Sequence, residues 1–208
     1  MSNNPTLCFI GFGEAGQAIA AGLRESGVER IAAWDILFPQ AEGEKLKSAA
    51  AAIGVRCATS AADAVRDADI VVSAVTAAAS VEAAQSVKAH LAGKPFFLDI
   101  NSVSPGRKQD TAKLLGDAAR YVDAAVLAPI HPARHQTPLL LAGPHAEAPW
   151  AGRLDGPGWR EKRDVIRRHS LNPYAIDRCA WHHTASNSGS TRPCRVPPRF
   201  AILRKARA

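Results

Sequence analysis

The stretch LCFIGFGEAG, residues 7–16, decides the fold of this chain. A short apolar run leads directly into three glycines with the spacing G-x-G-x-x-G, and apolar residues at helical spacing follow. Each glycine has a mechanical task in such a unit. Gly11 allows a tight turn, Gly13 lets phosphates approach the backbone, and Gly16 lets a helix pack closely on its strand.

A second apolar run, Ile31–Trp34, ends in Asp35, about 20 residues beyond the glycines. Strand, glycine turn, helix and a second strand closed by an acid form the fingerprint of a dinucleotide-binding βαβ unit, in which backbone N–H groups and the helix dipole hold the pyrophosphate. Asp35 is predicted to accept the ribose 2′-OH, whereas a 2′-phosphate about 4 Å away would be repelled by ~1–4 kcal/mol. Neither Ile36 nor Leu37 is an arginine that would reverse this preference. NAD is therefore favoured over NADP.

The predicted cofactor contacts lie in the glycine turn and at the ends of the second and fourth strands. Val75 and Thr76, at the fourth strand end, lie where this fold lets the backbone pass the nicotinamide ribose, and ordinary strand-end packing is the alternative. The complete predicted set is Gly11, Phe12, Gly13, Glu14, Ala15, Gly16, Asp35, Val75 and Thr76.

Beyond Asp35 the chain keeps alternating between helix and strand patterns. This alternation predicts an α/β fold, a Rossmann-like, doubly wound, mostly parallel sheet with ligands bound at the carboxyl ends of its strands. Ser60 and Ser104 are predicted helix N-caps, and Pro105 follows Ser104 at the first helical position. The further strands are predicted at 55–57, 69–75, 96–99, 121–126 and 139–142, and the helices at 43–52, 61–66, 80–91 and from 105.

Composition divides the chain into a domain at 1–148 and an atypical tail at 149–208. Residues 1–150 hold 13 basic and 15 acidic residues, whereas residues 151–208 hold 13 basic and 4 acidic residues. The tail is rich in Arg, Pro, Trp, His and Cys and shows no sustained period, which argues against a packed structure there.

The lack of a targeting signal and the setting of the cysteines predict a cytoplasmic protein without a membrane span. No stretch of 18 apolar residues exists, and the N-terminus lacks a basic and then apolar signal sequence. Cys8 and Cys57 lie in apolar strand patterns, which suit reduced, buried thiols.

Three segments carry a resemblance to a known family. They are FIGFGEAG at 9–16, DINSVSP at 99–105, which is similar to D-x-S-[ST]-x-x-P, and the stretch 122–143, which is similar to V-D-A-P-V-S-G-G…G-T-L…G-G. Residues 6–148 thereby resemble the NAD(P)-binding domain of the β-hydroxyacid dehydrogenase superfamily, which includes 6-phosphogluconate and 3-hydroxyisobutyrate dehydrogenases. Asn101 stands at the first Ser of the second segment, and Leu-Ala-Pro at 127–129 replaces Ser-Gly-Gly. These departures resemble the less characterised phosphogluconate-dehydrogenase-like branch.

The resemblance implies an NAD(P)-dependent oxidoreductase that moves a hydride between nicotinamide and a hydroxy acid or related carbonyl, and the same scaffold could reduce imines. It implies that Asn101 and Ser102 bind the substrate, and the alternative for Asn101 is that it orients the nicotinamide amide. It also implies a second, all-helical domain that supplies a catalytic lysine and makes a homodimer. Lys162 and Lys205 are the lysines after Lys113, and neither lies in an apolar helical setting. The catalytic residue is therefore left unassigned.

An alternative is a catalytically incompetent dinucleotide-binding remnant, and the tail composition suggests a hypothesis of a shifted reading frame beginning between residues 149 and 168. A further hypothesis is that the basic tail binds nucleic acid, but no recognised nucleic-acid-binding module accompanies its basic residues. Pro132 separates His131 from His135, which favours a substrate-loop or surface role over a metal-binding helix. Cysteines and histidines of the tail match no common zinc spacing, so no metal site is predicted; they are Cys179, His182, His183 and Cys194.

Overall fold

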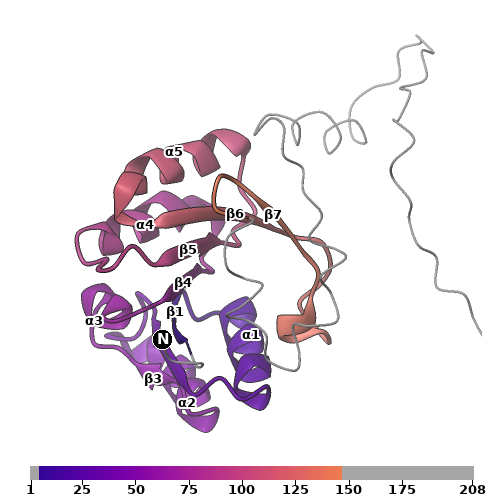
Figure 1. Cartoon of the computed structure of the whole chain (residues 1–208). Coiled ribbons are helices and arrows are strands. Elements are labelled where there is room, and N and C mark those ends of the chain that lie inside the picture. The colour runs from indigo at the N-terminus through magenta and orange to yellow at the C-terminus, as the bar shows by residue number, and fades with distance from the viewer. Residues whose placement is uncertain (1–4, 147–208) are drawn as a thin grey trace, which may run out of the picture. The chain divides into compact units, whose positions relative to one another are not determined.

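The structure, a computed structural model, describes residues 5–146. The predictions made for the tail at 149–208, including its lysines and its cysteine–histidine cluster, lie outside the described residues. Within 5–146 the chain forms one seven-stranded sheet with helices on both faces (Figure 1).

The strand order of the sheet is β3-β2-β1-β4-β5-β6-β7. All neighbouring pairs run parallel except β6 and β7, which are antiparallel. The order reverses between β1 and β4, because β2 and β3 lie on one side of β1 and all later strands on the other. This confirms the Rossmann-like, mostly parallel sheet. The strands are β1 (Thr6–Ile10), β2 (Arg30–Trp34), β3 (Arg56–Cys57), β4 (Ile70–Ser73), β5 (Phe96–Asp99), β6 (Arg120–Val126) and β7 (Leu139–Ala142).

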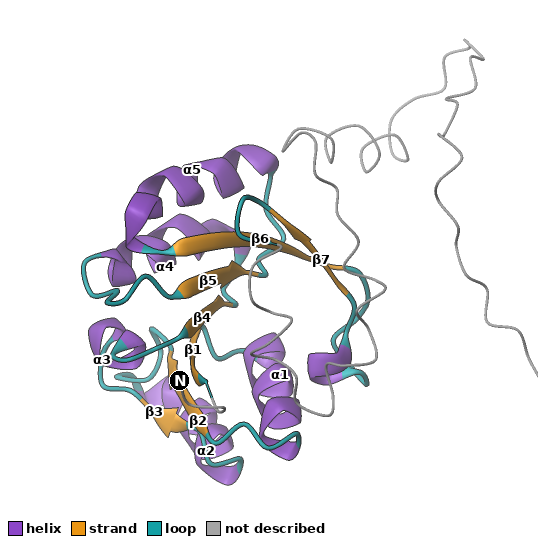
Figure 2. Cartoon of the chain, viewed as in Figure 1, coloured by secondary structure: helices purple, strands orange, loops and turns teal. Residues whose placement is uncertain are grey.

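Two apolar clusters fill the core, one on each face of the sheet. One contains buried residues of α1 and α2, and the other contains buried residues of α3, α4 and α5. Alternate residues of β1 divide between them, since Leu7 and Phe9 belong to the first cluster and Cys8 and Ile10 to the second. Figure 2 shows the central strands running between these helices. The helices are α1 (Glu14–Glu25), α2 (Glu44–Ala52), α3 (Ala61–Val65), α4 (Ser80–Lys88) and α5 (Pro105–Leu115).

Helix boundaries follow the predicted caps. The Ser60 hydroxyl accepts a hydrogen bond from the Asp63 N–H at 3.0 Å and begins α3. Ser104 is the N-cap of α5, with Pro105 at its first position. The helix predicted to reach residue 91 ends at Lys88. Of the helices in residues 5–146, none is both long and apolar enough to cross a membrane.

The two cysteines of the described chain are both free thiols. Cys8 is fully buried in β1, and burial raises the pKa of its thiol. Cys57 is only half-buried, because β3 is two residues long and forms the edge of the sheet. The prediction of two buried thiols is therefore correct for Cys8 and wrong for Cys57.

Candidate dinucleotide site

The glycine turn joins β1 to α1 with backbone contacts too close for any side chain. Gly11 has φ +90°, and a Cβ built there would lie 2.3 Å from the Ala74 carbonyl oxygen. Its N–H donates to the Trp34 carbonyl at 2.9 Å. A Cβ at Gly16 would lie 2.7 Å from the Gly11 carbonyl oxygen, so α1 packs directly on the turn. Gly13 differs, because a Cβ there would meet nothing within 4 Å. The glycine turn thus combines two packed glycines with one that faces open space.

The amino end of α1 opens on that space. Its N-cap is Gly13, and no side chain caps the helix. The Gly13 carbonyl accepts the Gln17 N–H at 3.0 Å, so the helix proper begins at the turn. The N–H groups of the first turn of a helix point outward along its axis and, with the helix dipole, favour an anion. Glu14 is exposed in that first turn, and Ala15 is half-buried beside it.

Phe12 takes part in the turn through its backbone. Its side chain is fully buried and packs edge-on against Phe9 and Phe38, with ring centroids 6.5 and 6.3 Å away. Its N–H points the other way and donates to an oxygen of Asp35 at 2.7 Å. A ligand of the turn would therefore meet the Phe12 backbone and not its ring.

Asp35 follows β2 and is held by backbone on both sides. Its Oδ2 accepts the Phe12 N–H, and its Oδ1 accepts the Leu37 N–H at 3.0 Å. A carboxylate has about four lone-pair positions, so two of them remain for hydroxyl groups. Ile36, the next residue, leaves 75% of its surface exposed. The acid is thus fixed in direction and adjacent to the turn, as the sequence predicts.

Strand ends on both sides of the order reversal form the carboxyl edge of the sheet, and we call this edge between β1 and β4 the crevice. Ligands of open α/β sheets bind outside the carboxyl ends of the strands at such a reversal. Gly11 and Asp35 lie on its β1–β2 side. Val75 and Thr76 follow β4, and Ser102 follows β5 on the other side. Thr76 and Ser102 are exposed, and Val75 is half-buried. The structure therefore brings the predicted cofactor and substrate residues to one edge of the sheet.

Asn101 is buried and its amide is engaged within the protein. Its Oδ1 accepts the Val75 N–H at 2.7 Å, while its Nδ2 donates to Ser73 Oγ at 2.9 Å and to Asp99 Oδ1 at 2.8 Å. Its own N–H also donates to Asp99 Oδ1, at 3.0 Å. The predicted substrate-binding residue thus joins the ends of β4 and β5, and its contact with a substrate stays a prediction.

Beneath Asn101 lies a buried ion cluster that the sequence did not reveal. The Lys108 ammonium of α5 lies 3.0 Å from Asp99 Oδ1 and 2.9 Å from Asp123 Oδ1, and it donates to the Asp99 carbonyl at 2.8 Å. The Tyr121 hydroxyl donates to Asp99 Oδ2 at 2.9 Å. One signal was present, because Lys108 precedes the buried Leu115 by two helical turns and so shares its face.

The electrostatics of this cluster are those of a dry interior. Asp99 is fully buried, whereas the Asp123 side chain is 27% exposed. Burial and the neighbouring Asp99 carboxylate raise the pKa of Tyr121, so its hydroxyl stays protonated as a donor. Asp99 and Asp123 are therefore engaged within the fold, and their partners include side chains of α5 and β6 as well as the adjacent turn.

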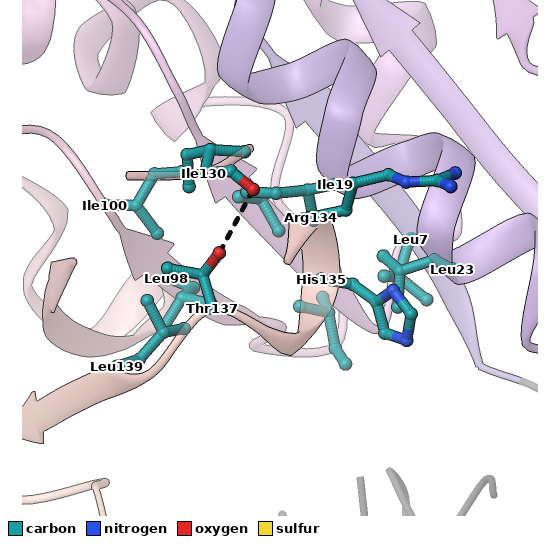
Figure 3. Close-up of a pocket in the computed structure, with 12 residues that line it drawn as sticks. Leu7, Ile19, Leu23, Leu98, Ile100, Ile130, Arg134, His135, Thr137 and Leu139 are labelled. Atoms are coloured by element: carbon teal, nitrogen blue, oxygen red, sulfur yellow. Dashed lines mark hydrogen bonds between the residues drawn. The ribbon is translucent and has the colours of Figure 1, made fainter. Parts of the chain in front are cut away.

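A small cavity lies between α1 and the segment that joins β6 to β7. Its volume is about 40 Å³, and its walls are mainly aliphatic side chains of α1 and the sheet (Figure 3). The segment is anchored on α1, where the His135 ring lies 2.9 Å from the Ser26 hydroxyl and Arg134 pairs with Glu25 at 2.5 Å. A Cβ at Gly22 would overlap the His135 ring. His135 therefore packs on α1, a role that the spacing of His131 and His135 did not indicate.

Among residues 5–146, no three histidine, cysteine or acidic side chains are grouped so as to hold a metal ion. The features that can hold a ligand are instead those of the crevice. An open, uncapped helix end faces the turn, a fixed carboxylate stands beside it, and exposed strand ends continue the edge. These residues fit a dinucleotide, with its phosphates at α1.

Comparison with known proteins places the fold. Residues 6–101 match the model of the family described as NADP oxidoreductase coenzyme F420-dependent. No curated protein matches the chain. A conserved hypothetical protein from Sinorhizobium meliloti 1021 is 37% identical, with a TM-score of 0.67 over 72% of this chain and 50% of that one.

Two enzymes of known activity have the same fold. A V8 variant of an imine reductase from Myxococcus stipitatus, solved with NAD+, is 29% identical, with a TM-score of 0.54 over 67% of this chain and 47% of that one. The imine reductase of that organism is also similar in its complex with NADP+. Mycobacterium tuberculosis 3-hydroxyisobutyrate dehydrogenase, solved with L-serine, is 24% identical, with a TM-score of 0.60 over 78% and 51%, a likeness of fold alone.

The chain spans about half the length of these solved structures. The family model matches residues 6–101, which include the glycine turn and the first strands, where the dinucleotide fingerprint lies. The described residues therefore have the NAD(P)-dependent oxidoreductase fold that hydroxyacid dehydrogenases and imine reductases share, and residues 6–101 carry the match to an oxidoreductase family model.

Proposed function

We propose that the chain binds NAD across the carboxyl edge of its sheet and serves an oxidoreductase that acts on a small hydroxy acid, or on a related carbonyl or imine. The observation that carries this proposal is the open face of Gly13 at the uncapped end of α1. Backbone N–H groups there have the geometry and dipole to hold a pyrophosphate, and a side chain would occupy the same space.

Each half of the crevice has a separate task. The turn and Asp35 hold the ADP half, with the carboxylate accepting ribose hydroxyls. The backbone at Val75 and Thr76 then lies at the nicotinamide half, and the exposed Ser102 hydroxyl is placed to bind a substrate oxygen. Bound NAD supplies the hydride chemistry, and the protein supplies binding, orientation and proton transfer.

The preference for NAD over NADP rests on Asp35. Two backbone N–H groups hold its carboxylate beside the turn, so the side chain cannot swing away from a 2′-phosphate without losing both hydrogen bonds. Repulsion of the phosphate by this charge is worth about 1–4 kcal/mol at 4 Å. The exposed Ile36 offers no compensating positive charge.

A second candidate function is dinucleotide binding without turnover. The buried lysine of the described chain, Lys108, already contacts two carboxylates and a carbonyl, so its ammonium is committed to the fold. Lys108 is therefore not available to transfer a proton to the substrate. Without a general acid or base the rate falls by roughly 10²–10⁴-fold.

Calorimetric titration of the full chain with NADH and NADPH tests the binding function. We expect tighter binding of NADH, and we expect the Gly13→Ala variant to lose roughly tenfold to a hundredfold in NADH affinity, because its methyl group separates the phosphates from the helix N–H groups. The fold should tolerate this variant, since Gly13 has φ −71° and open space around it.

Gly106→Ala, the same change at another position with open space, is the matched control and should bind NADH like the original chain. Unchanged NADH affinity in Gly13→Ala would contradict the proposed site. An assay with 3-hydroxy acids and cyclic imines then separates the two functions. Turnover of a substrate supports the oxidoreductase, and tight NADH binding without any turnover supports the second candidate.

A further inference from the structure

The buried ion cluster extends to the crevice through one amide. Asp99 Oδ1 receives both the Asn101 Nδ2 and the Lys108 ammonium, and Asn101 Oδ1 in turn receives the Val75 N–H. An unbroken series of polar contacts therefore runs from α5, through the end of β5, to the backbone that follows β4. Its last member is the peptide assigned above to the nicotinamide half.

The chemistry of Asp99 decides which way the Asn101 amide faces. A carboxylate only accepts hydrogen bonds, so it selects the NH₂ group of the amide and turns the carbonyl oxygen toward Val75. The Val75 N–H only donates and makes the same selection from the other side, so an uncharged amide at position 99 would weaken the hold on the Asn101 NH₂ group and leave Val75 as the main determinant. The Asp99 charge itself is sustained in the dry interior because Lys108 and Tyr121 supply donors to both of its oxygens.

The peptide held in this way also contacts the glycine turn. The Ala74–Val75 peptide has its N–H on Asn101 Oδ1, and its carbonyl oxygen lies where a Cβ of Gly11 would come within 2.3 Å. The Ala74 N–H donates to the Ile10 carbonyl at 2.8 Å. The orientation of Asn101 thus sets the direction of the backbone that forms the nicotinamide side of the crevice.

We propose that Asp99 and Asn101 are positioning residues for the nicotinamide half of the bound dinucleotide, with Asp99 orienting the Asn101 amide and that amide orienting the Val75 peptide. This inference rests on the proposed NAD-binding function. It gives Asn101 an indirect task, through the Val75 peptide, in place of the direct contact with the substrate or the nicotinamide amide that the sequence predicts, and it connects a buried charge cluster to cofactor geometry.

The test compares two ligands that share the ADP half. NADH contacts both halves of the crevice, whereas ADP-ribose lacks the nicotinamide, so the ratio of their affinities isolates the nicotinamide half. In the full-length Asn101→Ala variant we expect NADH affinity to fall roughly threefold to tenfold, the range of one positioned hydrogen bond, while ADP-ribose affinity stays within about twofold.

A second variant guards against loss of the fold. Asp99→Asn combined with Lys108→Met removes both charges at similar volume, so it should fold even where Asn101→Ala does not. We expect the same selective loss of NADH affinity in it. Asp110→Asn, on the exposed side of α5, is the matched control and should leave both affinities unchanged.

The outcomes are distinct. Equal losses for NADH and ADP-ribose, or no loss for either, overturn the positioning role and leave the cluster a purely structural one. If the unaltered chain binds neither ligand, the proposed function fails, and this inference fails with it. A selective loss for NADH in a variant whose melting temperature shows it to be folded supports the proposal.

Discussion

Replacing Lys108 by Met tests the buried ion cluster directly. Met keeps the apolar stem of the side chain and removes the ammonium, which has three oxygen neighbours at 2.8, 2.9 and 3.0 Å. Asp99, at 0% exposure, is then left without its cation. The neighbouring Asp123 is 27% exposed and can turn partly to water. The cost is therefore expected to arise mainly at Asp99.

Breaking a buried ion pair by removing one partner costs about 3–5 kcal/mol, since an uncompensated charge remains in the interior. A domain has roughly 5–15 kcal/mol of stability in total, so this single change removes a large fraction of it. With about 2–4 °C of melting temperature for each kcal/mol in a chain of this length, we expect Lys108→Met to melt roughly 6–20 °C lower.

Urea unfolding of the full chain, followed by far-ultraviolet circular dichroism, measures the free energy. Lys113→Met, an exposed position on the same helix, should lie within about 0.5 kcal/mol of the original chain. Adding Asp99→Asn to Lys108→Met should restore part of the loss, because the stranded charge is gone. The reasoning is refuted if Lys108→Met is as stable as Lys113→Met, or if the double variant is less stable than Lys108→Met alone.

Three further predictions concern pH, packing and cofactor choice. The pKa of Tyr121 is raised in the folded chain, so the stabilisation that its protonated hydroxyl provides is fully present below the ordinary tyrosine pKa near 10. Above that pH the free energy of unfolding falls, because only the unfolded chain loses the proton. Urea titrations should show that Tyr121→Phe removes about 1.4 kcal/mol per pH unit of this slope. Gly22→Ala should loosen segment 130–139 from α1, because its methyl group takes the space of a packed ring, and faster cleavage of that segment by trypsin would show it. Asp35→Asn with Ile36→Arg should raise NADPH affinity relative to NADH by about tenfold or more, measured by calorimetry, since it removes a repulsive charge and adds an attractive one.

Local signals explain why the fold was predictable from the sequence. Positions 7–16 combine a strand pattern, a glycine spacing and a helix pattern, and each of these depends on neighbours only a few residues away. Ser60 and Ser104 cap the helices that they were expected to cap. The antiparallel pairing of β7 was not specified, because strand direction depends on the route of segment 127–138 and not on the strand's own residues.

The residues of the site likewise divide into those that local sequence signals identified and those that they did not. Asp35 could be identified because its distance from the glycines is set by one helix and one strand. Lys108 could not, because its meaning depends on carboxylates from two strands, Asp99 and Asp123, that meet only after the sheet forms. The packing of His135 on α1 could not be predicted for a similar reason. Its partner surface is made by Gly22 in α1, more than a hundred residues earlier, and a lone glycine in a helix has several explanations.

This division has a consequence for how the two halves of the crevice respond to mutation. In the proposed site, the ADP half is formed by backbone groups, glycines and Asp35, so we expect substitutions that add a Cβ or remove this acid to disturb it. In the same proposal the nicotinamide half depends on side chains, because Asn101 accepts the Val75 N–H and itself donates to a buried carboxylate. Side-chain networks of this kind are lost as a unit, whereas backbone sites persist while the fold persists. Substitutions in the buried ion cluster should therefore affect the two halves differently. We expect such a variant still to bind ADP-ribose but no longer to position the nicotinamide ring.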